Sequence, residues 1–339
     1  MKKFLSTLLA ALAAVTLAFG LSACKPNNSD NSHFTVYMPD GAPALSMARL
    51  MAQDDKKVED TSLEYRVVAS EAIQSYVTGA NPAADICVLP VNLASKLLGS
   101  GEKYKMLGTV THGNLYILSK KYSEEITTAN LSSLNGKTVG VVKLADVPGL
   151  TLKVVLNDNG ITYNEEGLNA DSVYLKSISA TDVGLLSEVD YYVAPEPAAS
   201  TKANAVADLG IVGDLQQLYG GESGYPQAVL VAKNSVISFR DGAFVNAFMQ
   251  EVADGAQWLL SAETTGQIIY DAVAAHLPDG ASLSIDVNQL NNKTILSHCA
   301  IRFERAADCK AEVNGILSKF IAVDAQSAAN VSDSFYYAV

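Results

Sequence analysis

Short apolar runs alternate with amphipathic stretches along most of this chain of 339 residues, and the alternation limits its fold more than any other feature. Residues 33–39 (HFTVYMP), 62–70 (SLEYRVVAS) and 84–90 (ADICVLP) have the length and composition of strands. Between them, 42–53 (APALSMARLMAQ) and 71–79 (EAIQSYVTG) repeat apolar residues at helical spacing. Strand–helix–strand order is typical of parallel sheets covered by helices. We therefore predict an α/β fold.

The same order begins again near Leu134, after a linking region and before a helical C-terminal part. The linking region is predicted to contain a helix over 92–101 and strands over 104–110 and 114–120. The second half is predicted to contain strands over 136–142, 171–177, 190–197 and 227–236, with helices over 147–160 and 179–189. Long helices over 243–262 and 265–277 follow. We infer two α/β lobes built from mixed, mostly parallel sheets.

The N-terminus has the pattern of an export signal rather than of a folded element. The basic start MKK precedes an apolar run of 17 residues, which is short for a membrane span. The run ends in Leu-Ser-Ala-Cys, which resembles the lipobox of bacterial lipoproteins. That resemblance implies cleavage before Cys24 and diacylglycerol on its sulfur. The alternative is an ordinary secretory signal in which Cys24 has no such role.

These patterns predict four parts along the chain. Residues 1–23 are a lipoprotein signal peptide, and 24–32 are a polar tether that separates the folded body from the membrane. Residues 33–112 plus 237–339 form lobe 1, and residues 113–236 form lobe 2. The chain would then cross between the lobes twice.

Charge and cysteine content exclude some classes of protein. The net charge of −12, without a basic run longer than Lys120-Lys121 beyond the N-terminus, argues against a nucleic-acid partner. Cysteine and histidine spacings do not match a zinc site. Cys299 and Cys309 are ten residues apart and are a possible disulfide in an oxidising compartment, with two reduced thiols as the alternative.

Small residues, often proline or glycine, follow each predicted strand. In open α/β sheets, ligands bind outside the carboxyl ends of the strands, where helix N-termini expose N–H groups. Gly41 allows close approach of the backbone to a ligand, and Pro43 suits a first helical turn. Proline, glycine and small polar residues are common in any turn, so each of these strand-to-helix corners could also be a turn without a role in binding. The corners are Met38 to Pro43, Ser70-Glu71, Pro90 to Asn92, Val147 to Gly149 and Ala194 to Pro197.

These pieces together resemble one family across most of the chain. The lipobox, MPDGAP, ADICVLPVNLASKLL, LGTVTHGNLYILS and VDYYVAPEPAAST occur in an order similar to that of substrate-binding lipoproteins of ABC importers. The similarity is greatest to the nitrate/sulfonate/taurine and thiamine-pyrimidine-precursor branch. It implies a type II periplasmic-binding fold whose two lobes close over one solute.

The resemblance and the strand ends together give a set of expected ligand-binding residues. The resemblance implies Asp40, Gly41, Ala42, Asn92, Pro148, Gly149 and Glu196. Ser70 follows a predicted strand, and His112, Gly113 and Asn114 lie where the chain crosses between lobes. The aromatic residues that commonly enclose a pyrimidine in that branch are not evident at these corners. None of the corners contains an arginine that could clamp a sulfonate.

The function expected is that of a solute receptor that performs no catalysis. No GxSxG, HExxH, P-loop or GxGxxG motif occurs, and no cofactor or metal is expected. The resemblance implies a small organic molecule or anion as solute, of the sulfonate, nitrate or pyrimidine-like class. It also implies an ABC permease as partner and a monomer lipid-anchored on the outer face of the cytoplasmic membrane or in the periplasm. A tethered enzyme on the same fold and a surface interaction protein without a ligand are the alternatives.

Overall fold

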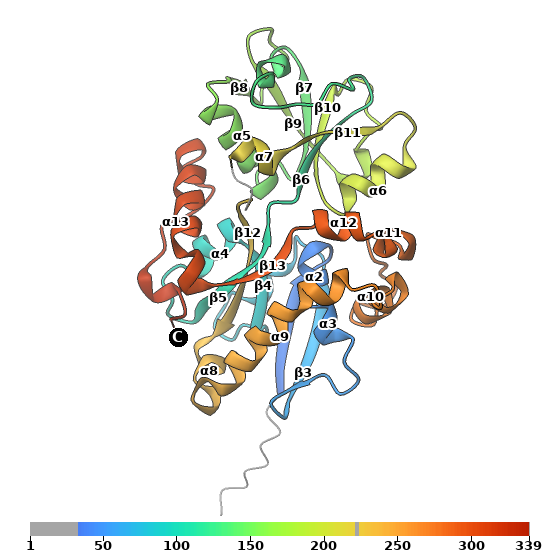
Figure 1. Ribbon diagram of the computed structural model, residues 1–339. Helices are drawn as coiled ribbons and strands as arrows, with labels where there is room; N and C mark the ends of the chain where they lie inside the picture. Colours follow the sequence, from blue (N-terminus) through green and yellow to red (C-terminus); the bar gives the residue numbers. More distant parts are fainter. Residues whose placement is uncertain (1–32, 221–223, 339) are drawn as a thin grey trace, which may run out of the picture. The chain divides into compact units, whose positions relative to one another are not determined.

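The computed structural model describes residues 33–220 and 224–338 (Figure 1). The expected signal peptide, Cys24 and the tether lie outside these residues. The described part contains two mixed β-sheets, each covered by helices on both faces. The predicted α/β, two-lobed class is therefore confirmed. We call the seven-stranded sheet with its helices lobe 1, and the six-stranded sheet with its helices lobe 2.

Lobe 1 is built on a sheet with the strand order β13-β5-β12-β4-β1-β3-β2. Its strands are β1 (His33–Pro39), β2 (Lys57–Val58), β3 (Thr61–Val68), β4 (Ile86–Pro90), β5 (Tyr104–His112), β12 (Pro226–Lys233) and β13 (Ile301–Arg305). β1 is parallel to β3 and β4, whereas β12 is antiparallel to β4 and β5. The ends of β1, β3, β4 and β5 and the start of β12 therefore lie at one edge of the sheet.

Helices cover both faces of this sheet because its strand residues are apolar on both sides. The helices of lobe 1 are α2 (Ala42–Leu45), α3 (Ala48–Met51), α4 (Val91–Leu98), α8 (Asn234–Ile237), α9 (Ala243–Leu260), α10 (Gly266–Ala274), α11 (Val287–Asn291), α12 (Lys293–His298) and α13 (Ala306–Val323). In β4, Ile86 and Val88 pack toward α3 and α9, whereas Cys87 and Leu89 pack toward α4 and α13.

Lobe 2 is built on a sheet with the strand order β11-β6-β10-β7-β9-β8. Its strands are β6 (Leu115–Ser119), β7 (Thr138–Val142), β8 (Tyr163–Asn164), β9 (Val173–Ile178), β10 (Tyr191–Pro195) and β11 (Gly210–Asp214), and its helices are α5 (Val147–Asp158), α6 (Ala198–Ala205) and α7 (Leu215–Tyr219). β7 is parallel to β9 and β10, so the ends of these strands share one edge with the start of the antiparallel β6.

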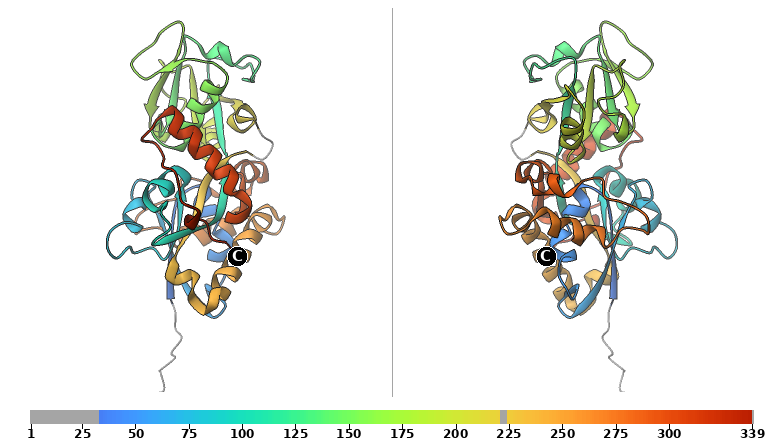
Figure 2. Two further views of the ribbon diagram at one scale, coloured as in Figure 1. Left: turned by 90° about the vertical axis from the view of Figure 1, so that its left-hand side faces the viewer. Right: turned by 90° about the vertical axis from the view of Figure 1, so that its right-hand side faces the viewer.

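Helix α13 packs against both lobes (Figure 2). It contacts α4 and β5 in lobe 1 and α5 in lobe 2. At its lobe 2 end, the Lys319 ammonium lies 2.8 Å from the Asp158 carboxylate and above the Tyr219 ring. The chain therefore connects the lobes through two crossings and supports them with one shared helix.

Several predicted elements are shorter than expected. The helix predicted over 179–189 is a single 3-10 turn, Ala180–Asp182, because Gly184 adopts a left-handed backbone with φ of 78°. The helix predicted over 42–53 is divided into α2 and α3, where the Ser46 hydroxyl donates to the Pro43 carbonyl. The helix predicted over 71–79 is a 3-10 turn, Ile73–Tyr76. The sequence analysis did not include β13, a half-exposed edge strand of five residues (IRFER) in which apolar and charged residues alternate.

Two further predictions need correction. Residues 226–233 were assigned to lobe 2, but β12 pairs with β4 and β5 in the middle of the lobe 1 sheet, so the return crossing precedes Pro226. The possible disulfide is also wrong, because Cys299 and Cys309 are both free. Cys299 is buried on the α9 face of the lobe 1 sheet and Cys309 on the α13 face, so the sheet separates them.

Candidate functional site

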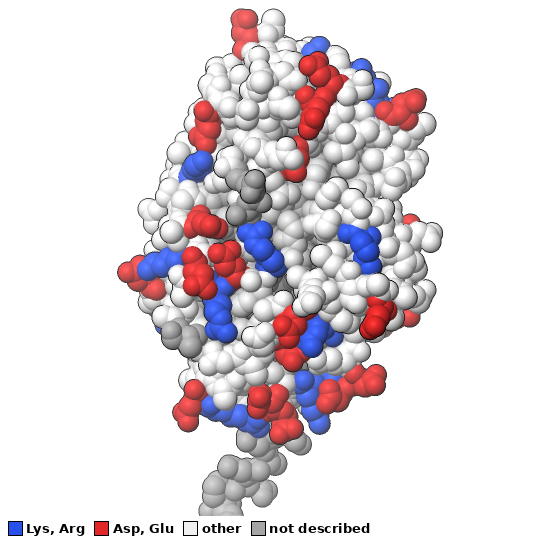
Figure 3. All heavy atoms as spheres, viewed as in Figure 1, with Lys and Arg blue, Asp and Glu red and all other residues white. Residues whose placement is uncertain are grey.

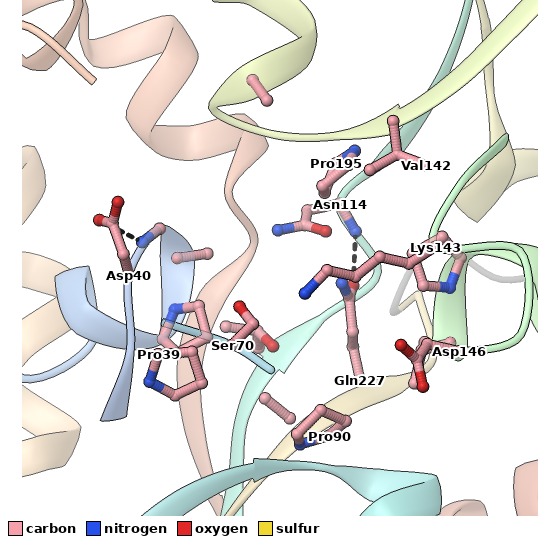
Figure 4. A pocket seen from close by; sticks show the side chains of 18 of the residues that line it. Pro39, Asp40, Ser70, Pro90, Asn114, Val142, Lys143, Asp146, Pro195 and Gln227 are labelled. Atoms are coloured by element: carbon pink, nitrogen blue, oxygen red, sulfur yellow. Dashed lines mark hydrogen bonds between the residues drawn. The ribbon is translucent and has the colours of Figure 1, made fainter. Parts of the chain in front are cut away.

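A cavity of about 380 Å³ lies where the strand ends of the two sheets meet (Figure 4). Lobe 1 contributes the ends of β1, β3, β4 and β5 and the start of β12. Lobe 2 contributes the ends of β7 and β10 and the start of β6. Its volume suits a small molecule, and its position at the carboxyl ends of parallel strands is where α/β sheets bind ligands.

The corner after β1 forms part of the lobe 1 wall. Gly41 has φ of 95°, a left-handed backbone that favours glycine, and it turns the chain from β1 into α2. The Asp40 carboxylate accepts the Gly41 N–H at 2.7 Å through one oxygen. Its other oxygen accepts the Ser284 N–H at 2.9 Å. Asp40 therefore ties the corner to the loop that carries Ser284, and both carboxylate oxygens have partners.

Glu196 and Asn114 form part of the lobe 2 wall. Their backbones pair, because the Glu196 N–H donates to the Asn114 carbonyl at 2.7 Å. The Asn114 side-chain nitrogen donates to the Glu196 carbonyl at 3.1 Å, which fixes the orientation of that amide. The Asn114 N–H donates to the Gln227 side-chain oxygen at 3.1 Å, linking this wall to β12 (Figure 4).

The Glu196 carboxylate is only 1% exposed. The backbone N–H and hydroxyl of Ser200, in the first turn of α6, both donate to it. His298 of lobe 1 lies 3.8 Å from it. Burial raises the pKa of Glu196, while the bonds from Ser200 and the charge of His298 partly oppose that rise.

An ion pair joins the two walls. Lys143 follows β7, and its ammonium lies 3.3 Å from the carboxylate of Glu71, which follows β3. Figure 4 shows the Lys143 side chain extending across the cavity toward the Ser70 corner. A hydrogen bond from its own backbone, followed by the charge of Lys143, lowers the pKa of Glu71.

Seven of the eleven expected residues line this cavity, and Gly113 is not among them: Asp40, Gly41, Ala42, Ser70, Asn114, Pro148 and Glu196. They come from five corners that are far apart in the sequence, and the strand ends bring them together. Whether they bind a ligand stays a prediction.

Asn92 and Gly149 do not line the cavity. The Asn92 side chain points toward the C-terminal segment and donates to the Ser327 carbonyl at 3.2 Å. Gly149 serves packing, since a Cβ at this position would lie 1.9 Å from the Leu144 carbonyl oxygen. Both expectations are corrected, because the first turns of α4 and α5 direct these residues into the protein interior.

His112 does not line the cavity either. It is completely buried at the end of β5, where its Nε2 lies 2.7 Å from the Thr109 hydroxyl and 3.3 Å from the Glu304 carboxylate. Burial, with a contribution from the charge of Arg302, lowers the pKa of His112 to about 3. The imidazole is therefore neutral at neutral pH, and its contact with Glu304 is not an ion pair.

Sequence reasoning named Glu71 only as part of a corner and missed several other polar lining residues, namely Gln74, Thr111, Lys143, Asp146, Gln227 and Ser284. Lys143 and Asp146 lie between the end of a predicted strand at 142 and the predicted helix that begins at 147. Including every residue of that connection would have found them. Gln227 and Ser284 could not be found in that way, because Gln227 lies at the start of an antiparallel strand and Ser284 in a loop between α10 and α11.

Other features of the described part bear on possible function. No cluster of three or more metal-ligating side chains occurs among residues 33–220 and 224–338. None of the helices in these ranges is long and apolar enough to cross a bilayer. On the face shown in Figure 3, basic and acidic side chains are interspersed, without an extended basic patch among the residues drawn in colour.

Comparison with solved structures identifies the fold. An ABC transporter protein from Parabacteroides distasonis has a TM-score of 0.68 at 17% identity, over 91% of this chain and 99% of that chain. The periplasmic aliphatic sulfonate-binding protein of Escherichia coli has a TM-score of 0.64 at 13% identity, over 91% and 92%. A putative periplasmic sulfonate-binding protein of Methylobacillus flagellatus has a TM-score of 0.60 at 11% identity, over 91% and 92%.

These identities are low enough that the likeness shows the fold alone. The structural neighbours are transport-associated binding proteins, sulfonate-binding proteins among them, as the resemblance in sequence predicts. The two-lobed periplasmic-binding-protein fold is thus confirmed. No family model matches the sequence. No curated protein matches it either.

Proposed function

We propose that this chain is the lipid-anchored solute-binding receptor of an ABC importer and captures one small organic molecule or anion between its lobes. The observation that carries the proposal is the cavity of about 380 Å³ lined by strand ends of both sheets. A solute held there would touch both lobes, so its binding would favour a closed arrangement of the lobes. A sulfonate, a nitrate or a pyrimidine-like molecule is the range of solutes that the resemblance implies.

A ligand screen tests this function. Purified protein lacking residues 1–32 is heated with individual sulfonates, nitrate, pyrimidines, amines and amidines, and the melting temperature is recorded. A ligand that binds the folded state raises the melting temperature. At concentrations above its Kd, this rise grows with the logarithm of the ligand concentration. A rise of several degrees for one solute, absent in its close analogues, supports the proposal. If no small molecule raises the melting temperature, the receptor function is wrong.

The proposal includes a non-enzymatic role and a permease partner in the cytoplasmic membrane, with the protein acting as a monomer. A receptor returns its ligand unchanged, whereas the alternative, a tethered enzyme, converts it. Incubation of excess ligand with the protein, followed by mass spectrometry, distinguishes these functions. Recovery of a product would favour the enzyme.

Lipid anchoring through Cys24 is a separate part of the proposal, and residues 1–23 would then be the removed signal peptide. Several acyl chains on one residue hold a protein at a membrane far more firmly than a single chain. The full chain should therefore fractionate with membranes, and Cys24→Ser should move it to the soluble extracytoplasmic fraction. Membrane association that survives Cys24→Ser would contradict the anchor without affecting the receptor function.

A further inference from the structure

The side chains that line the cavity carry more negative than positive charge. The charged lining residues are Asp40, Glu71, Lys143, Asp146 and Glu196, which gives four carboxylates, one ammonium and a formal charge of −3. The ammonium of Lys143 is paired with Glu71 at 3.3 Å. Among the described residues, the one cation that lines the site therefore already has a partner when an anionic solute enters.

Carboxylates of the chain itself occupy the positions that an anion would take at the corners. Helix N-termini and turns hold anions through free N–H groups. Here the Ser200 N–H, in the first turn of α6, donates to Glu196 at 3.0 Å. At the β1 corner, the Gly41 N–H donates to Asp40 at 2.7 Å. The expectation that these corners offer exposed amide donors is thus not met at two of them.

Proline reduces the supply of amide donors further, because it has no N–H. Six of the ten prolines in the chain line the cavity: Pro39, Pro43, Pro90, Pro148, Pro195 and Pro197. Their rings form rigid apolar walls together with Leu93, Val142 and Val147. Such walls suit the hydrocarbon part of an organic solute rather than a small inorganic anion.

Two acceptor groups at the cavity lack partners among the described residues. Asp146 is the N-cap residue of α5, yet its carboxylate makes no capping bond, and it faces the cavity (Figure 4). Asn114 is only 2% exposed, and its side-chain oxygen has no hydrogen-bond partner. Since the nitrogen of that amide is held by the Glu196 carbonyl, the unsatisfied atom is an acceptor. An unpaired buried acceptor is unfavourable, so a ligand that donates a hydrogen bond to it is bound more tightly.

We propose that the solute is a small organic cation that carries N–H donors, such as an ammonium, amidinium or guanidinium group on an apolar framework. The cationic group takes its polar contacts from Asp146 and Asn114 among the lining residues, and the proline-rich walls contact the framework. Anionic solutes are excluded by the four carboxylates. This inference rests on the proposed receptor function, and it replaces the sulfonate and nitrate part of the solute range given there with a cationic class.

Probes of matched shape and different charge test the inference. Benzamidinium, benzamide and benzenesulfonate form one series, and butylammonium, butyramide and butanesulfonate form another. Equilibrium dialysis against the protein lacking residues 1–32, read by mass spectrometry, gives the retained fraction of each. We expect the cation of each series to be retained more than its neutral and anionic counterparts, with a difference that shrinks as salt is added.

Two variants connect the charge preference to the cavity. Asp146→Asn keeps the shape of an exposed side chain and should weaken cation binding by about fivefold, without affecting the neutral probes. Asp171→Asn removes an exposed carboxylate of lobe 2 that does not line the cavity, and it should leave all the probes unchanged. Circular dichroism and melting temperature show that both variants fold.

The possible outcomes separate this inference from the receptor function. Preferential retention of the sulfonates, or of the neutral amides, overturns the cationic class and leaves the receptor function standing. Equal loss of cation binding in Asp146→Asn and Asp171→Asn shows a general charge effect and overturns the assignment of Asp146. Retention of none of the six probes overturns the cationic class, while the melting-temperature screen still decides the receptor function.

Discussion

The ammonium of Lys143 in lobe 2 lies 3.3 Å from the carboxylate of Glu71 in lobe 1, so an ion pair connects the two walls of the cavity. Lys143 directly follows β7, and Glu71 lies three residues after the end of β3. Glu71 is 77% exposed and Lys143 is 37% exposed, so solvent screens the pair. The contact is well placed to influence the arrangement of the lobes, although it adds little to stability.

Removal of this pair should change the arrangement of the lobes more than the stability of the fold. We expect Glu71→Gln to increase the radius of gyration of the ligand-free protein in small-angle scattering. The free energy of unfolding should fall by less than about 1 kcal/mol, because exposed ion pairs contribute little. Glu165→Gln is the matched control, since it breaks an ion pair with Lys153 inside lobe 2. Identical scattering from both variants and the wild type would show that the pair does not restrain the lobes.

Gly149 should tolerate no side chain. A Cβ at this position would lie 1.9 Å from the Leu144 carbonyl oxygen, and backbone atoms cannot yield as a flexible side chain can. We expect Gly149→Ala to lower the free energy of unfolding by about 1–3 kcal/mol, the usual cost of overpacking. Gly167→Ala is the control, because nothing lies within 4 Å of its added Cβ. Denaturant unfolding measures both, and an unchanged stability for Gly149→Ala would contradict the packing role.

Asn92 should affect stability rather than binding. Its buried side chain donates to the Ser327 carbonyl and so holds the C-terminal segment against α4. We expect Asn92→Ala to destabilise the protein by about 1–2 kcal/mol, while ligand affinity stays within twofold of the wild type. Asn114→Ala, at the cavity wall, provides the comparison and should weaken binding. A large loss of affinity in Asn92→Ala would restore it to the binding site.

Glu196 should make stability depend on pH in a direction opposite to that of an ordinary paired carboxylate. Burial raises its pKa above the usual 4.5, so the folded state binds a proton more tightly than the unfolded state does. The stabilising contribution of protonated Glu196 is complete below the pKa that this residue has in the unfolded state. It is lost as the pH rises through the pKa of Glu196 in the folded state. The stability of the wild type relative to Glu196→Gln should therefore fall as the pH is raised from about 4 to about 8.

Unfolding by urea at several pH values measures this difference. Asp214 and Glu304 also have pKa values raised chiefly by burial, but both remain in the variant, so the comparison isolates Glu196. A difference that grows as pH rises would mean that the bonds from Ser200 and the charge of His298 outweigh burial.

The sequence predicted the strands more accurately than the helices, and the reason is physical. The apolar run at β4 is buried on both faces, and β1 is buried on one face and partly buried on the other, so both strands are evident without tertiary context. The region around Gly184 has helical spacing, but its left-handed backbone ends the turn, and glycine in a sequence does not reveal its φ. The edge strand β13 alternates apolar and charged residues, but over only five half-exposed residues, and it pairs with β5 alone.

The sequence correctly predicted those lining residues that follow directly from their place at a strand end. It was wrong where the direction of a side chain determines whether a residue lines the cavity. Asp40 and Glu196 follow strands of different sheets, and the rule for α/β sheets correctly placed both at the cavity. Asn92 also follows a strand, yet α4 turns it toward Ser327. The capture of corner N–H groups by Asp40 and Glu196 depends on rotamers, which the sequence does not specify.

The account depends most on one claim, that a solute binds between the strand ends of both lobes. Calorimetric titration of the solute found in the screen into variants that fill the cavity from either side tests it most directly. Ser70→Trp acts from lobe 1 and Ala180→Trp from lobe 2, while Ser282→Trp places the same side chain at an exposed position outside the cavity. We predict that binding is lost in the first two variants and retained in the third. Undiminished binding in both Ser70→Trp and Ala180→Trp, with the folds intact, would contradict the claim.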